Sequence, residues 1–336
     1  MKKTETVYLL GAGASRGSRH RLPLMGEFFT YESLRANSYS NLRRAIRTAF
    51  PRTSLNRLNL EWVLTYLDLT LSPVGNRWGG RSVSTERSQF AEARRELEKY
   101  IVDRLKVDET MKTPCEIHVA LVRALEYRDT VLTLNYDLIM DRAFYSCGDG
   151  RLNGLLHLTS IPAFQGGEPM APRPGEIDPG LYIKLHGSID WATCPRPECG
   201  NHEHFGDMRQ AGWERHVRVG APCRRCGTAL ELAIVTPSLI KEFDRMPKLA
   251  LLWNAAHRAL GRCTRLVISG VSFAPSDSAL RWLIQHSLVG SQRLEEVILV
   301  TRDDWAFRQL KGLLPGLTIR RRKSSFQQWV KSGALE

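Results

Sequence analysis

The last third of the chain alternates short apolar segments with longer amphipathic ones, and this alternation restricts the fold more than any other feature. RLVISG at 265–270 and EEVILV at 295–300 are typical of buried strands. SALRWLIQHSL at 278–288 and DDWAFRQLKGLL at 303–314 place apolar residues at helical spacing. Strand–helix–strand repeats favour β-α-β units with parallel strands. The predicted fold class is α/β: a Rossmann-like parallel sheet with helices on both faces.

The rest of the chain supplies further strands and a long helical block. Strand-like segments are Val7 to Leu10, TVLTLNYD at 130–137, LYIKLHGSIDW at 181–191 and LAIVTPS at 232–238. The pattern from about Leu24 to Tyr127 is helical, with a predicted loop at 73–84. We therefore predict a Rossmann-like domain from 1–24, 128–192 and 229–336. A helical module at 25–127 interrupts it, as does an insertion at 193–228, which contains two close pairs of cysteines and is predicted to be a zinc ribbon.

Bulk composition is that of a globular protein with a strong basic bias. The chain has 336 residues, of which 43% are hydrophobic and 25% charged, so it can form a sizeable core. No apolar run reaches the roughly 20 residues that a membrane helix needs, and we expect a cytoplasmic location. The net charge of +13 fits either a solvated basic surface or an anionic partner. The densest basic run is 320–323.

Small, polar or titratable residues follow the predicted strands. GAGAS at 11–15 follows the first strand, Asn135 and Asp137 close the second, and His186 with Gly187 interrupts the third. Val271 and Ser272 follow RLVISG. Ligands of doubly wound sheets bind beyond the carboxyl ends of the strands. Glycine lets the backbone approach a pyrophosphate, and a following helix N-terminus attracts the negative charge.

Each of these signals also has a purely structural explanation. The glycines could form a tight strand-to-helix turn, since no third glycine stands at dinucleotide spacing and no acidic residue ends a second strand about twenty residues on. Asn135 and Asp137 could be a helix cap and a first-turn acid. His186 could be a polar residue at a strand end. Their combination, in this order along the chain, favours a ligand site.

Four of the seven cysteines form two close pairs: Cys194 with Cys199, and Cys223 with Cys226. Close pairs in a reducing compartment indicate a metal rather than disulfides, and four thiolates are typical of a closed, structural zinc site. His202 or His204 could replace one thiolate. The other cysteines, Cys115, Cys147 and Cys263, lie in apolar or mixed segments and are expected to be core residues.

The ordered motifs resemble those of the sirtuin superfamily. GAGAS at 11–15 is similar to its glycine-rich NAD loop, and TLNYD at 133–137 to its Thr-Gln-Asn-x-Asp motif. KLHGS at 184–188 resembles its catalytic His-Gly turn, and SGVS at 269–272 its late Gly-Thr-Ser. The cysteine pairs lie where sirtuins carry a zinc ribbon. The resemblance extends from residue 5 to about residue 310.

The sequence departs from protein-deacylating sirtuins in three places. RLPLMGEFF at 21–29 replaces their Gly-x-Pro-Asp-Phe-Arg segment, Leu134 replaces a glutamine, and IVTPSLIKEF at 234–243 is a poor match to their peptide-clamping strand. GVSFAPSDSALRWL at 270–283 instead resembles the Gly-x-Ser-x-x-x-x-Asp pattern of bacterial sirtuin-like antiphage-defence effectors. Members of that branch hydrolyse NAD outright and so deplete it in infected cells.

The resemblance implies a role for each matching residue. His186 would be the general base, Asn135 would bind the ribose or an ordered water, and Asp137 would bind the nicotinamide carboxamide. These three residues are the implied catalytic set. The implied cofactor-binding set is Gly11, Ala12, Gly13, Ser15, Asn135, Asp137, Gly270, Ser272 and Asp277. NAD would be the substrate, and zinc, held by Cys194, Cys199, Cys223 and Cys226, would be structural.

Three functions follow from these motifs. The first is an NAD+ hydrolase that serves as an antiviral defence effector. The second is an NAD-dependent protein deacylase or ADP-ribosyltransferase, and the third is a zinc-containing nucleic-acid-binding module. A toxic hydrolase must be kept inactive, so we expect a homo-oligomer or a separate regulatory protein, contacting the helical block or the basic C-terminal region. Nucleic acid would bind only indirectly or through the basic surface, and no membrane partner is expected.

Overall fold

The computed structural model describes residues 4–18, 21–72, 83–106, 113–151, 180–196, 198–199, 201–204, 220–235, 247–289 and 291–335. Internal contacts divide the chain into two units. The sheet unit comprises Met1–Arg21, Val107–Ile234 and Glu242–Glu336, and the helical unit comprises Leu22–Lys106 and Val235–Lys241. No helix in the described part of the chain combines the length and apolar character that crossing a membrane requires.

A six-stranded, all-parallel sheet forms the centre of the sheet unit, in the order β3-β2-β1-β7-β8-β9. Its strands are β1 (Thr6–Leu10), β2 (Thr130–Thr133), β3 (Tyr182–Lys184), β7 (Arg265–Ser269), β8 (Glu296–Val300) and β9 (Ile319–Arg322). This order is that of a doubly wound Rossmann sheet, so the predicted fold class is confirmed. The strand order reverses between β1 and β7, where Leu10 pairs with Thr133 on one side and Ser269 on the other.

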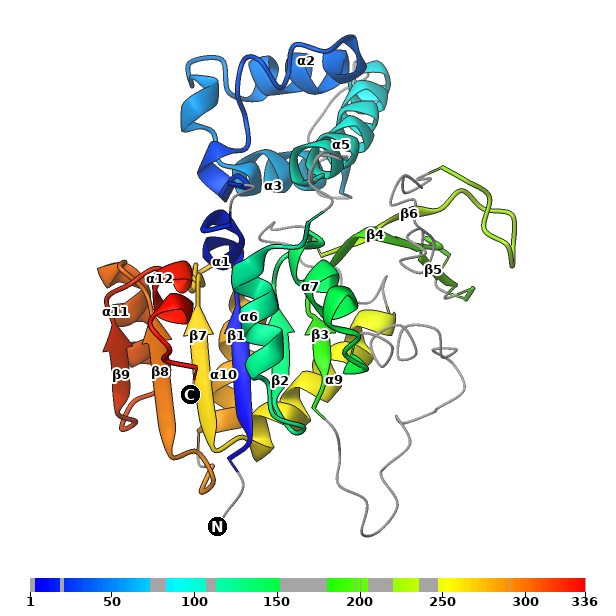
Figure 1. Ribbon diagram of the computed structural model, residues 1–336. Helices are drawn as coiled ribbons and strands as arrows, with labels where there is room; N and C mark the ends of the chain where they lie inside the picture. Colours follow the sequence, from blue (N-terminus) through cyan, green and yellow to red (C-terminus); the bar gives the residue numbers. More distant parts are fainter. Residues whose placement is uncertain are drawn as a thin grey trace. The chain divides into compact units, whose positions relative to one another are not determined.

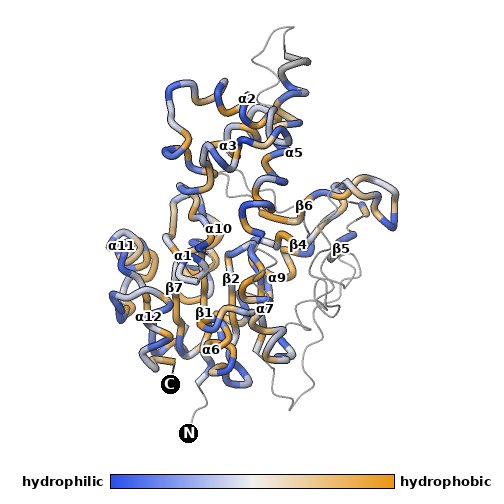
Figure 2. The backbone as a smooth tube through the Cα atoms, turned by 45° about the horizontal axis from the view of Figure 1, so that its top comes forward, coloured by the Kyte–Doolittle hydropathy of each residue, from blue (hydrophilic) through white to orange (hydrophobic). Residues whose placement is uncertain are grey.

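Helices cover both faces of this sheet (Figure 1). One face carries α6 (Glu116–Ala124), α7 (Ile139–Cys147) and α12 (Phe326–Lys331), and the other carries α9 (Pro247–Arg262) and α10 (Ser278–Leu288). The short α1 (Ala12–Arg16) follows β1, and α11 (Asp304–Leu313) packs beside α10. Because both faces are covered, the central strands are continuously apolar rather than alternating, as the hydropathy colouring of β1 and β7 shows (Figure 2).

The predicted strand at 181–191 is divided between two sheets at its His-Gly turn. Its first half is β3, and its second half is β4 (Gly187–Thr193). β4 pairs antiparallel with β5 (His202–His204) and β6 (Glu231–Ile234) in a small three-stranded sheet. Gly187 has a φ of +80°, and a Cβ there would lie 2.0 Å from the carbonyl oxygen of Ala233. Glycine is therefore required where the chain leaves the large sheet.

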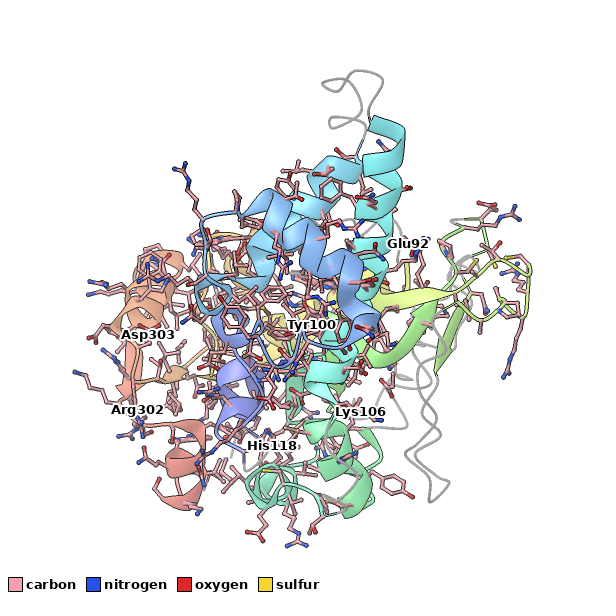
Figure 3. All side chains as sticks on the ribbon, turned by 90° about the horizontal axis from the view of Figure 1, so that it is seen from above. Glu92, Tyr100, Lys106, His118, Arg302 and Asp303 are labelled. Carbon is pink, nitrogen blue, oxygen red and sulfur yellow. The ribbon has the colours of Figure 1, made fainter. Side chains whose placement is uncertain are left out.

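The helical unit contains α2 (Ser40–Ala49), α3 (Leu60–Leu71) and α5 (Val83–Leu105), with single 3-10 turns at η1 (Met25–Glu27), η2 (Asn37–Tyr39) and η3 (Leu55–Arg57). Both α2 and α3 pack on α5. Tyr100 of α5 lies inside this unit, where it stacks on Phe29 and donates a hydrogen bond to the Phe28 carbonyl at 2.6 Å (Figure 3). A buried hydroxyl needs such a partner.

The division by contacts places the end of the helical unit at Lys106, whereas the sequence analysis placed it at residue 127. The difference arises because α6 packs against α7 and α12 beside the sheet. Most of the predicted loop at 73–84 lies outside the described residues. Within the described parts, α5 already begins at Val83 and α7 continues to Cys147.

Candidate functional site

The glycine turn after β1 packs directly against the turn after β7. The Gly11 N–H donates to the Ser269 carbonyl at 2.9 Å, and the Gly13 N–H donates to the Gly270 carbonyl at 3.1 Å. A Cβ at position 11 would lie 2.4 Å from the Gly270 oxygen, and one at position 13 would lie 2.7 Å from the Gly270 Cα. The close approach of these two backbones therefore requires the glycines at this point of the sheet.

This contact gives a different reason for the glycines from the one predicted. The sequence argument assigned them to the approach of a pyrophosphate, whereas the added Cβ atoms would meet protein backbone. The N–H groups of Gly13 and Ala14 are also committed, to the carbonyls of Gly270 and Gly11. The turn contributes chiefly by holding the β1 and β7 strand ends together at the switch point of the sheet, where ligands of this architecture bind.

Asn135 spans the gap between β2 and the glycine turn. Its Nδ2 donates to the Gly11 carbonyl at 3.0 Å and to the Ser15 hydroxyl oxygen at 2.9 Å. A carbonyl can only accept, so the Gly11 contact fixes which end of the amide is nitrogen. Both amide hydrogens are then used, and Oδ1 is the atom that can accept a hydrogen bond from a ribose hydroxyl or a water.

Asp137 lies two residues further on and is buried. Its Oδ1 accepts from the N–H of Ile139, the first residue of α7, at 3.0 Å. Burial raises the pKa of this carboxyl, while the positive charge of Lys184 and hydrogen bonds from Ile139 and Ser15 oppose the rise. Ser15 is thus shared between the two polar residues that follow β2.

His186 follows β3 and lies between two aromatic rings. The ring centroids of Tyr136 and Trp253 are 6.3 Å and 6.1 Å from the imidazole centroid. The Trp253 indole N–H donates to the Leu185 carbonyl at 2.8 Å, which fixes the backbone directly before the histidine. Only 7% of His186 is exposed. The imidazole is therefore held in an apolar setting that limits access of bulk water.

Asp277 precedes α10 and brings a carboxylate to the histidine. Its Oδ1 lies 3.6 Å from His186 Nε2, a distance that forms an ion pair when the imidazole is protonated. Burial, and secondarily the negative charge of Asp277, raises the pKa of the Tyr136 hydroxyl well above its usual range. The resemblance assigned Asp277 to the cofactor, and the structure places its carboxylate beside His186.

A buried charged network contacts the loop after β2, which carries two of the site residues. Lys184 Nζ is completely buried, donates to the Asp137 carbonyl at 2.6 Å, and forms an ion pair with Asp141 Oδ2 at 2.8 Å. The Tyr182 hydroxyl donates to the same carboxylate oxygen at 2.9 Å. The pKa of Asp190 is raised to about 6, because burial raises it and the positive charge of Lys184 opposes this rise only in part. This network ties β3 to the loop that carries Asn135 and Asp137.

The four paired cysteines form one cluster on the small sheet. Their Sγ atoms all lie within 4.8 Å of one another, with 3.4 Å between Cys194 and Cys226 and 3.7 Å between Cys199 and Cys223. A tetrahedral zinc with Zn–S bonds of about 2.3 Å separates its sulfurs by about 3.8 Å, so the cluster fits a zinc ion. All four are free thiols rather than disulfides.

Despite burial, neighbouring hydrogen-bond donors lower the pKa of Cys223, whereas burial raises the pKa values of Cys194 and Cys199. Cys223 Sγ accepts from the Asn201 amide at 3.3 Å and from the Arg225 N–H at 3.4 Å. Such donors stabilise negative sulfur. His202 packs edge-on against Trp191 with a centroid distance of 5.3 Å, and the side chain of His204 lies outside the described residues. The geometry supports the four-cysteine ligand set, which leaves no open coordination position.

The structure brings most of the predicted site residues to one edge of the sheet. The residues at or shortly after the carboxyl ends of β1, β2, β3 and β7 are Gly11, Ala12, Gly13, Ser15, Asn135, Asp137, His186 and Gly270. Asp277 lies directly before α10, and its carboxylate reaches His186. Ser272 is exposed on the loop after β7. The sequence analysis missed Tyr136, inside the TLNYD motif, and Trp253. Trp253 lies in a helix whose pattern predicts only core packing.

Comparison with solved structures gives the fold. No family model matches the chain, and no curated protein matches it. Two mutant Sir2 homologues in complex with ADP-ribose each share 15% identity at a TM-score of 0.50, covering 98% of this chain and 90% of theirs. A Sir2 homolog–NAD complex shares 16% identity at a TM-score of 0.49, covering 99% and 92%. The chain has a Sir2-like Rossmann fold with a cysteine cluster compatible with a zinc-binding insertion.

Proposed function

We propose that the protein binds NAD+ at the carboxyl edge of its six-stranded sheet and hydrolyses the nicotinamide–ribose bond, giving nicotinamide and ADP-ribose. The observation that carries this proposal is the pairing of His186 with Asp277, 3.6 Å apart, beside the loop that holds Asn135 against the glycine turn. Two proteins with this fold were solved with ADP-ribose, the nucleotide product of the proposed reaction.

The reaction needs a positioned nucleophile more than a strong acid. The bond breaks with oxocarbenium character at the ribosyl carbon, and the leaving nicotinamide is already cationic. The protein must hold the substrate in a reactive geometry and exclude bulk water. His186 is buried and lies near the rings of Tyr136 and Trp253, which suits this requirement.

His186 is the proposed general base, because imidazole accepts a proton near neutral pH. The carboxylate of Asp277 would stabilise the imidazolium after proton transfer. The Nδ2 group of Asn135 is used by the glycine turn. Its Oδ1 would accept a hydrogen bond from a ribose hydroxyl or from the attacking water. Asp137 would accept from the nicotinamide carboxamide.

The decisive experiment incubates purified protein with NAD+ alone and measures nicotinamide and ADP-ribose by chromatography. We expect both products from the wild type and a loss of about a hundred- to ten-thousand-fold in turnover for His186→Ala. Asn135→Ala should also lose turnover. His286→Ala is the matched control, because His286 is exposed on α10 and lies outside the proposed site. An unchanged rate in His186→Ala would refute the assignment of the base.

The second candidate function is transfer to a protein acceptor. It would use the same residues, so its substrates are what distinguish it from hydrolysis. Adding an acetyl-lysine peptide would accelerate nicotinamide release if the protein were a deacylase, whereas a hydrolase needs no peptide. The segment predicted to be a poor peptide clamp, 234–243, lies outside the described residues beyond Val235. Release of free ADP-ribose without any peptide supports hydrolysis.

The proposed biological role is that of an antiviral defence effector that depletes NAD+. It rests on the resemblance of GVSFAPSDSALRWL to the pattern of such effectors. Such an enzyme requires control, so we propose regulation by self-association or by a separate protein. Full activity of a dilute monomer without any partner would contradict this part of the proposal.

A further inference from the structure

The helical unit contains a segment whose charge is entirely positive. Residues 33–60 include six arginines (Arg35, Arg43, Arg44, Arg47, Arg52 and Arg57) and no aspartate, glutamate or lysine. Five of the six are exposed, the exception being the half-buried Arg43. The segment forms η2, α2, η3 and the loops between them, so these charges are carried by one continuous piece of folded surface.

A cavity of about 340 Å³ opens within this segment. Its walls include Tyr31, Leu34 and Phe50, and its arginines are Arg35, Arg43 and Arg47. A volume in the range of about 300–1,000 Å³, lined by apolar and aromatic groups with a few polar ones, is typical of ligand sites. Tyr31 is 74% exposed, which is unusual for a large aromatic ring and leaves its face open for stacking.

Arg43 differs from the other arginines because it is used by the fold. Its Nη1 donates to the carbonyls of Leu34 and Ala36, the latter at 2.7 Å, and so fastens the loop before η2 to α2. Within the described residues, the other five form no ion pair. Their guanidinium groups are therefore available to a ligand.

Three acids of α5 are used within the helical unit rather than by this surface, whereas the exposed Glu32 lies next to Tyr31 in the sequence. Glu96 accepts from the Leu42 N–H at 2.8 Å, and Asp103 accepts from the Tyr39 hydroxyl, so both serve the packing of α5 against the α2 region. Glu92 pairs with Arg95 on α5 itself. Acids and bases are thus in contact on α5, whereas within the described residues Arg35 and Arg47 at the cavity form no ion pair.

We propose that this surface binds single-stranded nucleic acid, an inference that goes beyond the proposed reaction and does not depend on it. Arginine pairs bidentately with phosphate and also stacks on bases. Five available arginines exceed what the phosphates of one mononucleotide require, which favours a strand. An open aromatic ring beside a base-sized cavity favours unpaired bases, because the bases of a duplex are not free to enter such a cavity. The aromatic ring also favours nucleic acid over an acidic peptide.

The test measures binding of a fluorescein-labelled oligothymidylate of about 12 nucleotides, a length suited to one such site, by anisotropy over a series of salt concentrations. Each neutralised phosphate of a single strand contributes about −0.7 to the slope of log K against log salt, so five contacts give about −3.5. Arg44→Gln with Arg47→Gln should weaken binding and reduce the steepness by about 1.4. Both are exposed on α2, and glutamine keeps the helix propensity.

Tyr31→Ala tests the stacking contact separately. It should weaken binding about 5- to 150-fold and leave the salt slope unchanged, because no charge is removed. The matched control is Arg322→Gln with Lys323→Gln, which removes two exposed charges from the basic run at the end of β9. Arg95→Gln is a second control, since this arginine of the helical unit already has an acidic partner.

The outcomes separate a built site from general attraction to a basic protein. Weaker binding in the α2 and Tyr31 variants, with unchanged binding in both controls, supports the proposal. Equal losses in the α2 variant and the Arg322/Lys323 control would overturn it, because net charge alone would then explain binding. Equal competition by thymidine monophosphate, by polyglutamate or by duplex DNA would also overturn it.

Discussion

Replacing Lys184 with methionine should destabilise the sheet unit severely, because this lysine is the buried cation on which the site loops depend. None of its side chain is exposed, and it holds the Asp137 carbonyl at 2.6 Å and the Asp141 carboxylate at 2.8 Å. Methionine fills a similar volume without a charge. The Asp141 carboxylate would then be buried without its cation, while the Tyr182 hydroxyl still donates a hydrogen bond to it.

Removal of one member of a buried ion pair costs about 3–5 kcal/mol, since the other charge is left without compensation. For a domain of this size, each kcal/mol lowers the melting temperature by about 2–4 °C, so a fall of about 6–20 °C is expected. The loss of the Lys184 charge should also raise the pKa of Asp190 further, because that charge opposes the effect of burial.

Thermal unfolding followed by calorimetry measures the effect, and a double variant isolates its cause. In Lys184→Met with Asp141→Asn, the amide oxygen still accepts from Tyr182 and no carboxylate remains at position 141. We expect the double variant to recover about 2 kcal/mol, leaving mainly the cost of an unpaired Asp137 carbonyl, about 1–3 kcal/mol. A double variant as unstable as the single one would show that lost packing, rather than an unpaired charge, causes the damage.

Three further perturbations test other parts of the structure. The pKa of Asp190 is raised from 3.8 to about 6. Its contribution to stability is therefore fully present below pH 3.8, where the carboxyl is neutral in both the folded and the unfolded state. As the pH rises from 3.8 through 6, the free energy of unfolding should fall by about 3 kcal/mol. In urea titrations between pH 4 and 7.5, Asp190→Asn should lose this dependence, and an equal slope in the wild type and the variant would contradict it. Native mass spectrometry should show one zinc per chain, and its removal by a chelator should lower the melting temperature; a folded, zinc-free protein with the same melting temperature would remove the zinc assignment. Gly270→Ala should destabilise beyond the left-handed cost of about 1–2 kcal/mol, because its Cβ would lie 2.3 Å from the Ala14 nitrogen; Gly148→Ala, with a φ of +64° and open space, is the control that has only that cost.

The sheet could be predicted because buried parallel strands are recognisable as short apolar runs between helices. Every segment predicted as a strand in the last third is a strand, and the basic run at 320–323 ends β9. The division of 181–191 between two sheets was not predicted. A single strand with a turn and two strands in different sheets have the same apolar pattern, and only the contact of Gly187 with Ala233 distinguishes them.

The members of the candidate site could be identified from the ends of the strands, but their mutual contacts could not. The proximity of Asp277 to His186 depends on how α10 begins relative to β3, two elements separated by more than ninety residues. The Lys184–Asp141 pair was missed for a similar reason. A lysine in an apolar strand beside a His-Gly turn carries no sign that α7 will place a carboxylate over it.

Charge density along the sequence also gave an incomplete picture of the basic surface. The run at 320–323 has the most consecutive cations, yet Arg320 and Arg321 pair with Glu296 and Asp304. The arginines around the cavity of the helical unit are spread over a longer segment, and within the described residues they form no ion pair. Whether a cation is available depends on which acids the fold has already used, and a count along the chain does not contain that information.

The glycine motif therefore has less weight as evidence for NAD+ than its resemblance suggests. Gly11, Gly13 and Gly270 are required by one another, since each would carry a Cβ into the backbone of the opposite turn. A protein that kept this fold and lost its activity would need the same glycines. His186 and Asn135 are different: packing at a strand end does not require an imidazole, and Asn135 keeps its Oδ1 in addition to the two hydrogen bonds that it donates to the glycine turn. Activity must accordingly be judged from these side chains, and the intact glycine turn shows only that the two halves of the sheet meet.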